Sequence, residues 1–402
     1  MSRVVIVGGG AAGLELASLL GRSVEPHDEV ILVEAETRHY WKPRFHEIAA
    51  GTFDNDLDTI CYFSHGAKNG YRHYQARMTD INPEDKQLIV YKPNGEKDSL
   101  AYDYLVIAIG AISNDFATKG AQEHCLFLDT PLQARDSWQQ ISSLLRSGGQ
   151  RTINIVGAGA TGLELAAELA KVSAHLSQNP YAAKLTINLI EAADRVLPNS
   201  PLKMSQEAQL RLEKCQVNIM LNTRIASVEQ QGMTTSDGLN LNADVQFWAA
   251  GIKAPDWLHN IGGLESNHAN QLMVKQSLVS TLDSHIFSLG DCAAIPQADG
   301  SMVPPKAQAA DRAAVHLAKS LKGLMQGKEL TPFVYKDGGM IVSIGHGYAI
   351  STMMNDKLIL KGRLVRRLYD TIFRLHQKTV SGLFTMSRLI ITKRLKCIFQ
   401  PN

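Results

Sequence analysis

Residues 3–13 have the sequence RVVIVGGGAAG, and residues 152–162 have the closely similar sequence TINIVGAGATG. In each stretch a run rich in β-branched residues predicts a buried strand, and the glycines that follow predict a tight turn. A helix rich in leucine and alanine comes next, and a further strand follows at 29–33 and at 185–190. The chain is therefore predicted to contain one strand–helix–strand unit twice, as an internal duplication.

The spaced glycines of the first copy are those of a dinucleotide-binding turn. Gly8 makes the turn, Gly10 lets the backbone approach a pyrophosphate, and Gly13 allows the helix to pack closely. The amino end of that helix supplies amide donors and the positive end of its dipole to the anion. Glu34 ends the next strand 21 residues after the last glycine, where its carboxylate can accept hydrogen bonds from ribose hydroxyls.

The second copy has Gly157, Gly159 and Gly162 in the same three positions. Glu191 ends its second strand 29 residues after the last glycine, and a longer crossover helix accounts for the excess. A carboxylate there repels a 2′-phosphate and so favours NADH over NADPH, a preference that Arg195 nearby reduces. Two such sites indicate a tightly bound FAD and an exchangeable NADH. The alternative is that one copy is an unoccupied relic of the duplication.

The composition excludes several classes of protein. The 402 residues are 45% hydrophobic, which is enough for two large domains and an appendage. The net charge is only +2, so the chain is not expected to bind nucleic acid. Five scattered cysteines form no CxxC or CxxxxC pair, so we expect no redox disulfide, no bound metal and a reducing cytosol. Neither a signal peptide nor an apolar run of about 18 residues is found, so a spanning helix is not expected.

The order of the predicted elements indicates that the second unit is inserted in the first. A strand at 104–109 ends at Gly110 before the second copy, and a strand at 285–289 leads into Gly290-Asp291 after it. We therefore predict a first domain at residues 1–125 and 283–332, a second domain at 126–282 and a C-terminal region at 333–402.

The C-terminal segment carries an unusual charge. From Arg363 onward the chain has nine Lys or Arg and one acid, Asp370. Apolar residues recur at helical spacing in 364–375, Gly382 interrupts the pattern, and a second basic and apolar segment occupies 383–399. This is typical of a helix that lies in an anionic bilayer interface, with arginine and lysine side chains reaching the headgroups. The alternatives are a dimerisation helix and a core helix with a solvated basic face.

Several further segments give the chain a resemblance to a known family. They are Trp41-Lys42-Pro43, His46-Glu47, Ser113-Asn114-Asp115-Phe116, Gly157–Leu169, WAAGIKAP at 248–255, Gly290-Asp291-Cys292-Ala293 and PPKAQAA at 304–310. Over nearly its whole length the chain resembles the type II NADH:quinone dehydrogenases, especially the bacterial membrane-associated ones, among the flavoproteins with two dinucleotide-binding domains. The resemblance implies an α/β fold with two Rossmann-like domains of the glutathione-reductase type, the second inserted in the first, and C-terminal strands and amphipathic helices.

The resemblance also implies where the ligands bind. One FAD per chain is expected to contact Gly8, Gly10, Ala12, Gly13, Glu34, Lys42, Gly110 and Asp291. NADH is expected to contact Gly157, Gly159, Gly162, Glu191 and Gly251.

Two residues are expected to act in the reaction itself. Glu164 matches a position where related enzymes have a carboxylate between nicotinamide and isoalloxazine, and the alternative is a solvated helix carboxylate like Glu168. Gln308 lies in the family's quinone-site segment, where its amide can bond a quinone carbonyl, and helix-start capping or solvation is the alternative. The family often has Gln or Glu shortly after, whereas this chain has Asp311-Arg312, which puts a second polar contact in doubt.

These observations together predict an NADH:quinone oxidoreductase without proton pumping. A hydride would pass from NADH to FAD, and two electrons would then pass to a membrane quinone, because no cysteine pair is available to accept them. Arg366 or Arg367 is a candidate for electrostatic assistance to quinol protonation. We expect a peripheral, monotopic protein on the cytoplasmic face of the inner membrane, in contact with anionic lipid.

Two other functions and several details stay open at this point. The chain could be a soluble NADH-dependent reductase of a small iron–sulfur or rubredoxin-like carrier, or a flavin-based NADH redox sensor. The sequence does not decide between ubiquinone and menaquinone, nor whether the chain forms a homodimer.

Overall fold

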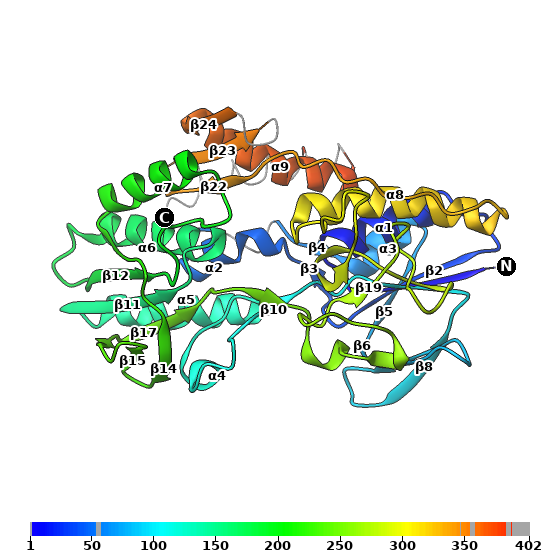
Figure 1. Ribbon diagram of the computed structural model, residues 1–402, viewed down its shortest axis with the longest axis horizontal. Helices are drawn as coiled ribbons and strands as arrows, with labels where there is room; N and C mark the ends of the chain where they lie inside the picture. The colour runs from blue at the N-terminus through cyan, green and yellow to red at the C-terminus, as the bar shows by residue number, and fades with distance from the viewer. Residues whose placement is uncertain (1, 54–57, 346, 354–357, 383–386, 388–402) are drawn as a thin grey trace.

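The computed structural model describes residues 2–53, 58–345, 347–353, 358–382 and 387. The first dinucleotide unit has a five-stranded parallel sheet in the order β20-β9-β1-β2-β5 (Figure 1). Its strands are β1 (Arg3–Val7), β2 (Glu29–Glu34), β5 (Arg72–Gln75), β9 (Tyr104–Ile107) and β20 (Ile286–Ser288). The nearby shorter elements are β3 (Arg38–His39), α2 (Phe45–Ala49), β4 (Ile60–Cys61), α3 (Tyr62–Asn69), β19 (Leu272–Met273) and β21 (Ala293–Ala294).

The central strand β1 is buried on both faces, which explains its continuous apolar sequence. Val4 and Ile6 pack in a cluster with residues of α1 (Ala11–Gly21) and α8 (Ala307–Met325). Val5 and Val7 face the other way and pack against an antiparallel sheet of β6 (Arg77–Asn82), β7 (Gln87–Tyr91) and β8 (Lys97–Ala101). The sheet is therefore the middle of three layers, and its carboxyl edge carries the Gly8 turn.

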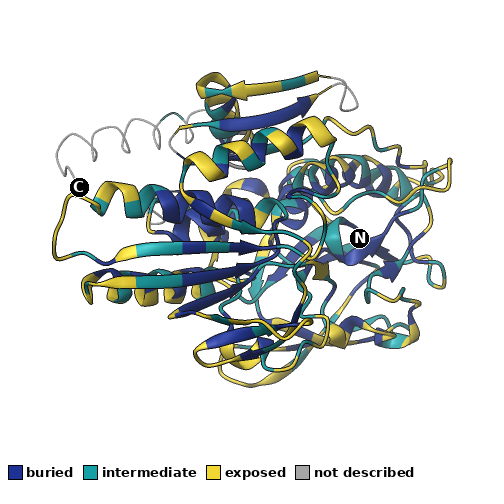
Figure 2. Cartoon of the chain, turned by 60° about the vertical axis from the view of Figure 1, so that its left-hand side comes forward, coloured by how far each residue is buried: buried dark blue, intermediate teal, exposed yellow. Residues whose placement is uncertain are grey.

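The second unit repeats this plan with a four-stranded parallel sheet in the order β13-β12-β11-β17. Its strands are β11 (Gln150–Val156), β12 (Lys184–Ile190), β13 (Val217–Met220) and β17 (Val245–Trp248). The layers around it contain α4 (Ala121–His124), α5 (Pro131–Arg146), α6 (Ala160–Leu176), α7 (Leu202–Lys214), β14 (Ile225–Glu229), β15 (Gly232–Thr235) and β16 (Asn240–Asn242). Figure 2 shows the strands largely buried between these layers. Both predicted strand–helix–strand units are confirmed.

The chain crosses between the two units on one pair of short antiparallel strands. β10 (Ile112–Ser113) leads out of the first unit, β18 (Ile252–Lys253) leads back, and the two pair with each other. The packing does not follow the boundaries predicted at 125/126 and 282/283. Ala121 and Cys125 pack with the second sheet, whereas Ala254 and Leu258 pack against the first. We propose that the domain boundaries lie at the crossing strands instead.

The C-terminal region lies across both units as a small sheet and a helix. β22 (Ile341–Ser343), β23 (Ala349–Met353) and β24 (Leu358–Gly362) form an antiparallel sheet, and α9 (Arg363–Ser381) packs against it (Figure 1). The strands and the helix agree with the C-terminal strands and amphipathic helix expected from the sequence. The second predicted basic segment, 383–399, lies outside the described residues except for position 387. In the part that is described, no helix is both long and apolar enough to cross a membrane.

Candidate active site

The first glycine turn is closed on two sides and open on the third. Gly8 has a φ of +98°, and a Cβ added there would lie 2.5 Å from the Ala108 carbonyl oxygen. A Cβ on Gly13 would lie 1.8 Å from the Gly8 carbonyl oxygen, so only glycine permits this packing of helix on turn. A Cβ on Gly10 would meet no atom within 4 Å. The open side is where a pyrophosphate can approach the amino end of α1.

The second glycine turn has the same geometry. Gly157 has a φ of +99°, and a Cβ added there would lie 2.7 Å from the Ala250 Cα. A Cβ on Gly162 would lie 2.0 Å from the Gly157 carbonyl oxygen, whereas one on Gly159 would meet nothing within 4 Å. Both predicted dinucleotide cradles are thus present at the carboxyl edges of their sheets, and both fit the group that the sequence assigns to them.

The two ribose-site carboxylates are held in matching ways. Glu34 Oε2 accepts a hydrogen bond from the Gly9 amide at 2.6 Å, and Glu191 Oε2 accepts one from the Ala158 amide at 2.7 Å. The other oxygen of each accepts an amide two residues further along the chain, at 3.0 Å and 2.9 Å. Each carboxylate is therefore fixed beside its glycine turn, where its remaining lone pairs can accept ribose hydroxyls.

Two buried side chains that the sequence did not single out form hydrogen bonds to the first glycine turn. Tyr62 donates its hydroxyl to the Gly9 carbonyl at 2.7 Å, and His39 Nδ1 lies 2.9 Å from the same oxygen. Burial lowers the pKa of His39 to about 4, so the ring is neutral at pH 7 and Nδ1 is the donor. These residues lie 30 and 53 positions from Gly9, a separation at which the sequence carries no signal of contact.

The remaining predicted flavin-site residues meet at the same edge of the first sheet. Gly110 follows β9 with a φ of +75°, and Lys42 Nζ donates to the carbonyl of the next residue, Ala111, at 2.7 Å. Burial raises the pKa of Asp291, and the positive charge of Lys42 acts against that rise. Ala12 lies against Gly290, since a Cβ on Gly290 would be 3.9 Å from the Ala12 Cβ.

Glu164 is buried at the junction of the two units and the C-terminal region. Its Oε1 accepts a hydrogen bond from the Ser343 backbone amide at 2.8 Å, and its Oε2 lies 3.4 Å from His46 Nδ1. Because only 7% of Glu164 is exposed, the alternative of a solvated helix carboxylate is wrong. Glu168, one turn later, is buried as well and pairs with Lys171 at 3.2 Å.

The surroundings of Glu164 contain a charged cluster that sequence reasoning missed. Glu47 lies between two arginines, with Oε2 at 3.2 Å from Arg44 Nη1 and Oε1 at 2.7 Å from Arg366 Nη2. Burial alone would raise the pKa of Glu47, but Arg44, His46 and Arg366 outweigh it and lower the pKa. Glu47 and Arg366 are 319 positions apart, so only the fold brings them together.

Gln308 is the second residue of α8, and its side chain bonds to a neighbouring loop rather than to its own helix. Gln308 Oε1 accepts the Tyr335 hydroxyl at 3.2 Å and the Gly338 amide at 3.1 Å. The Gly338 amide can only donate, so it fixes which end of the Gln308 amide is oxygen, whereas the Tyr335 hydroxyl also lies 3.3 Å from Asp337 Oδ1. The Nε2 hydrogens are the ones directed elsewhere. Gln308 is exposed, so a ligand can reach them.

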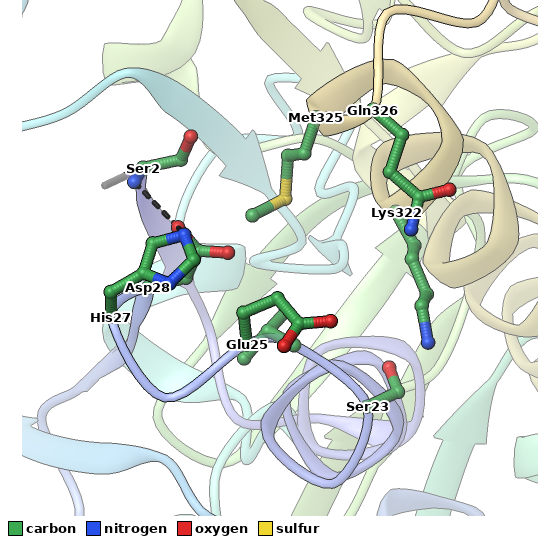
Figure 3. Close-up of a pocket in the computed structure, with 9 residues that line it drawn as sticks. Ser2, Ser23, Glu25, His27, Asp28, Lys322, Met325 and Gln326 are labelled. Carbon is green, nitrogen blue, oxygen red and sulfur yellow. Dashed lines mark hydrogen bonds and ion pairs between the residues drawn. The ribbon is translucent and has the colours of Figure 1, made fainter.

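One short segment ties the two predicted reactive residues together. Gly338 contacts Gln308 and Ser343 contacts Glu164, and five residues of chain span at most about 18 Å. Gln308 and Glu164 therefore both contact the same short segment of the C-terminal region. The pocket in Figure 3 is separate from it, because its lining residues, such as Ser2, lie at the amino end of β1.

Comparison with known proteins shows the family of the chain. Residues 2–314 match the family model described as pyridine nucleotide-disulphide oxidoreductase. The chain is 36% identical to the type II NADH:quinone oxidoreductase of Haemophilus influenzae over 440 aligned positions, covering 100% of this chain and 99% of the relative. It is 27% identical to the enzyme of the same name from Staphylococcus aureus over 387 positions, covering 92% and 94%.

A solved structure supports the fold independently. NDH2 from Plasmodium falciparum in complex with NADH superimposes with a TM-score of 0.86 at 18% identity, covering 99% of this chain and 98% of that one. The predicted resemblance and the predicted fold class are therefore confirmed. The chain belongs to the pyridine nucleotide-disulphide oxidoreductase family and, within it, to the type II NADH:quinone oxidoreductases.

Proposed function

We propose that this chain oxidises NADH and passes the electrons to a quinone. It is an enzyme of the type that its full-length relatives are named for, an FAD-dependent NADH dehydrogenase. When bound, FAD supplies the chemistry by taking a hydride from NADH and returning two electrons to the acceptor. Within the structure, the observation that most favours a quinone as acceptor is the orientation of the Gln308 amide.

The first glycine turn suits the role of holding FAD. Gly8, Gly10 and Gly13 leave the amides at the amino end of α1 free to bind a pyrophosphate, and Glu34 is fixed to accept ribose hydroxyls. Lys42 and Asp291 provide a cation and a carboxylate at the same sheet edge. The fixed dipoles and charges need little rearrangement when the ligand binds.

The second turn suits the role of the exchangeable NADH site. Gly157, Gly159 and Gly162 repeat the cradle, and the carboxylate of Glu191 disfavours a nucleotide with a 2′-phosphate. Glu164 lies one turn into the helix that follows, where its carboxylate can accept hydrogen bonds from the nicotinamide carboxamide.

The hydrogen bonds of Gln308 support a role in binding the acceptor. A quinone carbonyl accepts hydrogen bonds and donates none, so it needs a protein N–H or O–H. Tyr335 and Gly338 occupy the oxygen of the Gln308 amide and leave its Nε2 hydrogens for that carbonyl. An amide turned the other way would present an oxygen and repel the quinone.

We further propose that α9 and β24 rest on a membrane surface. Leu364, Leu368, Ile372 and Leu375 form one stripe along α9 with exposed fractions between 38% and 76%, and Leu358 and Leu360 of β24 are exposed as well. Exposed apolar residues in one stripe are typical of a helix that lies in a bilayer interface. A quinone from the lipid would then enter the protein at the face beneath the C-terminal region. We assign this surface to the cytoplasmic side of the inner membrane.

The expectation that the arginines of this helix reach the headgroups is wrong for two of them. Arg366 pairs with Glu47, and Arg374 pairs with the buried Asp58 at 2.8 Å, so both point into the protein. The apolar residues split between the two faces, since Val365 and Phe373 are buried while the leucine stripe is exposed. Membrane binding is therefore proposed to depend on the stripe more than on these charges.

The acceptor assignment is tested by measuring NADH oxidation with a short-chain quinone and comparing wild type with Gln308→Glu. This variant keeps the oxygen that accepts from Tyr335 and Gly338 but loses the N–H donors. We expect the KM for quinone to rise about tenfold, because the variant loses one neutral hydrogen bond and leaves the quinone carbonyl without a partner. The KM for NADH should be unchanged. An unchanged KM for quinone would remove Gln308 from the acceptor site.

The same assay separates the alternative functions. Activity with small iron–sulfur carriers but not with quinone would favour the soluble reductase. Loss of NADH no faster than its spontaneous reaction with oxygen would favour the redox sensor.

The membrane proposal is tested by flotation with anionic vesicles. The double variant Leu368→Ser with Ile372→Ser should reduce the vesicle-bound fraction several-fold. Each substitution removes about 1–2 kcal/mol of the free energy gained when the apolar side chain enters the bilayer. Leu202→Ser with Leu210→Ser on α7, two leucines of similar exposure, is the matched control. Truncation after Lys361 is a poorer test, since it would remove Arg366 from Glu47 and Arg374 from Asp58. Equal retention of both variants would contradict the proposal.

A further inference from the structure

The inward face of α9 carries two arginines with different partners. Arg374 donates to Asp58 at 2.8 Å and to Gln377 at 2.6 Å. Arg366 instead reaches the buried cluster beside Glu164. The two side chains lie on the same helix, have similar exposure and each pair with a buried carboxylate. They therefore form a natural pair for comparison.

Arg366 connects three segments of the chain through one guanidinium group. Its Nη2 lies 2.7 Å from Glu47 Oε1 and 3.4 Å from Asp370 Oδ1, and its Nη1 donates to the Ser343 hydroxyl. The backbone amide of that same serine donates to Glu164 at 2.8 Å. One residue thus separates the guanidinium from the carboxylate that is proposed to face the nicotinamide.

The charges around Glu164 come from two elements. α2 contributes His46 and Glu47, and α9 contributes Arg366 and Tyr369. Burial raises the pKa of Glu164, and Glu47 adds to the rise, whereas His46, the Ser343 amide and Arg366 oppose it. Glu47 has two arginines at contact distance and stays ionised, so Glu164 is the carboxylate of this cluster whose charge can change.

We propose that Arg366 is a positioning residue for Glu164, which it holds through Ser343 and stabilises as an anion through its charge. A planar guanidinium suits this role, because it can bind Ser343, Glu47 and Asp370 at once in a fixed geometry. The helix that carries the exposed apolar stripe then also carries a residue on which the NADH site depends. This inference rests on the proposed role of Glu164 toward the nicotinamide.

The test compares Arg366→Gln with Arg374→Gln in the full-length, FAD-loaded protein. For Arg366→Gln we expect the Kd for NADH, measured by direct titration, to rise roughly five- to tenfold. Removing the cation also raises the pKa of Glu164, so whichever form of Glu164 is active, the limb of the pH profile that it governs moves to higher pH. Both variants lose an ion pair with a buried carboxylate, so we expect their melting temperatures to fall by similar amounts. Arg374→Gln, however, should leave the pH profile and the Kd for NADH unchanged.

Two further variants make the result decisive. Arg366→Lys keeps the positive charge but loses the planar guanidinium with its several N–H donors. It should therefore have the pH profile of the wild type while its Kd for NADH stays raised. Ser343→Ala removes the hydroxyl that Arg366 contacts and keeps the backbone amide that donates to Glu164. It tests the role of Arg366 even if Arg366→Gln does not fold. We expect it to raise the Kd for NADH about threefold.

Identical behaviour of Arg366→Gln and Arg374→Gln, or a Ser343→Ala variant with unchanged Kd, would overturn the inference. The proposed role of Glu164 fails by a separate result. If Glu164→Gln leaves the Kd and the kinetics of NADH unchanged, that role is wrong, whatever the arginine variants show.

Discussion

The two dinucleotide units place a glutamate at the same position, the eighth residue counted from the first glycine. These residues are Glu15 in the first unit and Glu164 in the second, and both are buried. The glycine turns, the fixed ribose-site carboxylates and the helices that follow are alike in the two units. The difference between the two glutamates therefore comes from what packs against each helix.

Glu15 faces α8, where its neighbour is another carboxyl group. Burial and the nearby Asp311 raise the pKa of Glu15 to about 9, so it is protonated at neutral pH. Glu164 faces His46 and Ser343, which belong to the first unit and the C-terminal region, and a cation lies one residue away. The duplication supplies one scaffold twice, and the neighbouring segment decides whether the carboxyl lies beside another carboxyl group or beside groups that favour its anion.

Substitutions of Gly10 and Gly159 test the comparison of the two glycine turns most directly. Both have an extended backbone, with φ of −66° and −67°, and a Cβ on either would meet no protein atom within 4 Å. Alanine at these positions is thus expected to fold normally and to collide only with a bound pyrophosphate. Gly10→Ala should lose more than nine-tenths of its FAD, measured by absorbance after desalting. Gly159→Ala should keep its FAD and raise the KM for NADH more than tenfold.

The reverse result would exchange the two assignments. Loss of FAD from Gly159→Ala, with full FAD in Gly10→Ala, would show that the first cradle is the exchangeable site. Gly8→Ala is a useful control for folding, because its positive φ and the contact with Ala108 predict misfolding rather than a clean loss of ligand.

The two glutamates should respond differently to the same isosteric change. We expect Glu164→Gln to lower kcat/KM for NADH about 10- to 100-fold, which corresponds to about 1.4–2.7 kcal/mol of lost interaction. Glu15→Gln should change it less than about threefold, because the native side chain is already neutral. Steady-state NADH oxidation with a short-chain quinone measures both. Equal losses would mean that the carboxyl acts through the scaffold and not through its neighbours.

The parts of this molecule that sequence predicts are those with local causes. The strand 29–33 matches β2 at Glu29–Glu34, because β-branched residues and a bounding turn decide it within a few positions. The glycine turns were predicted residue by residue for the same reason. The periodicity of α9 was predicted correctly, but not the direction of its arginines, because both of its faces carry apolar residues.

Contacts between distant segments had no local cause and were not predicted. Arg366 meets Glu47 across 319 positions, and Ser343 meets Glu164 across 179. The family resemblance singled out Glu164 and Gln308, but it could not name the side chains that orient them. The packing of Ala254 on the first sheet was not predicted either, because it depends on contacts between distant segments.

The last effect predicted by the comparison is on stability, and it concerns Glu15 alone. A carboxyl with an ordinary pKa of 4.5 when unfolded and about 9 when folded releases its proton on unfolding anywhere between these values. The free energy of unfolding contributed by this group therefore falls as the pH rises from 4.5 toward 9. Glutamine cannot ionise and escapes this loss.

Glu15→Gln and the wild type should accordingly have nearly the same melting temperature at pH 5. At pH 8.5 the variant should be the more stable of the two, with a higher melting temperature in thermal unfolding of the FAD-loaded protein. Asp311→Asn should give a smaller gain in the same direction, because it removes a group that raises the pKa of Glu15 and leaves the burial unchanged. A gain at pH 5 that equals the gain at pH 8.5 would show that Glu15 does not titrate, and the contrast with Glu164 would then rest on packing alone.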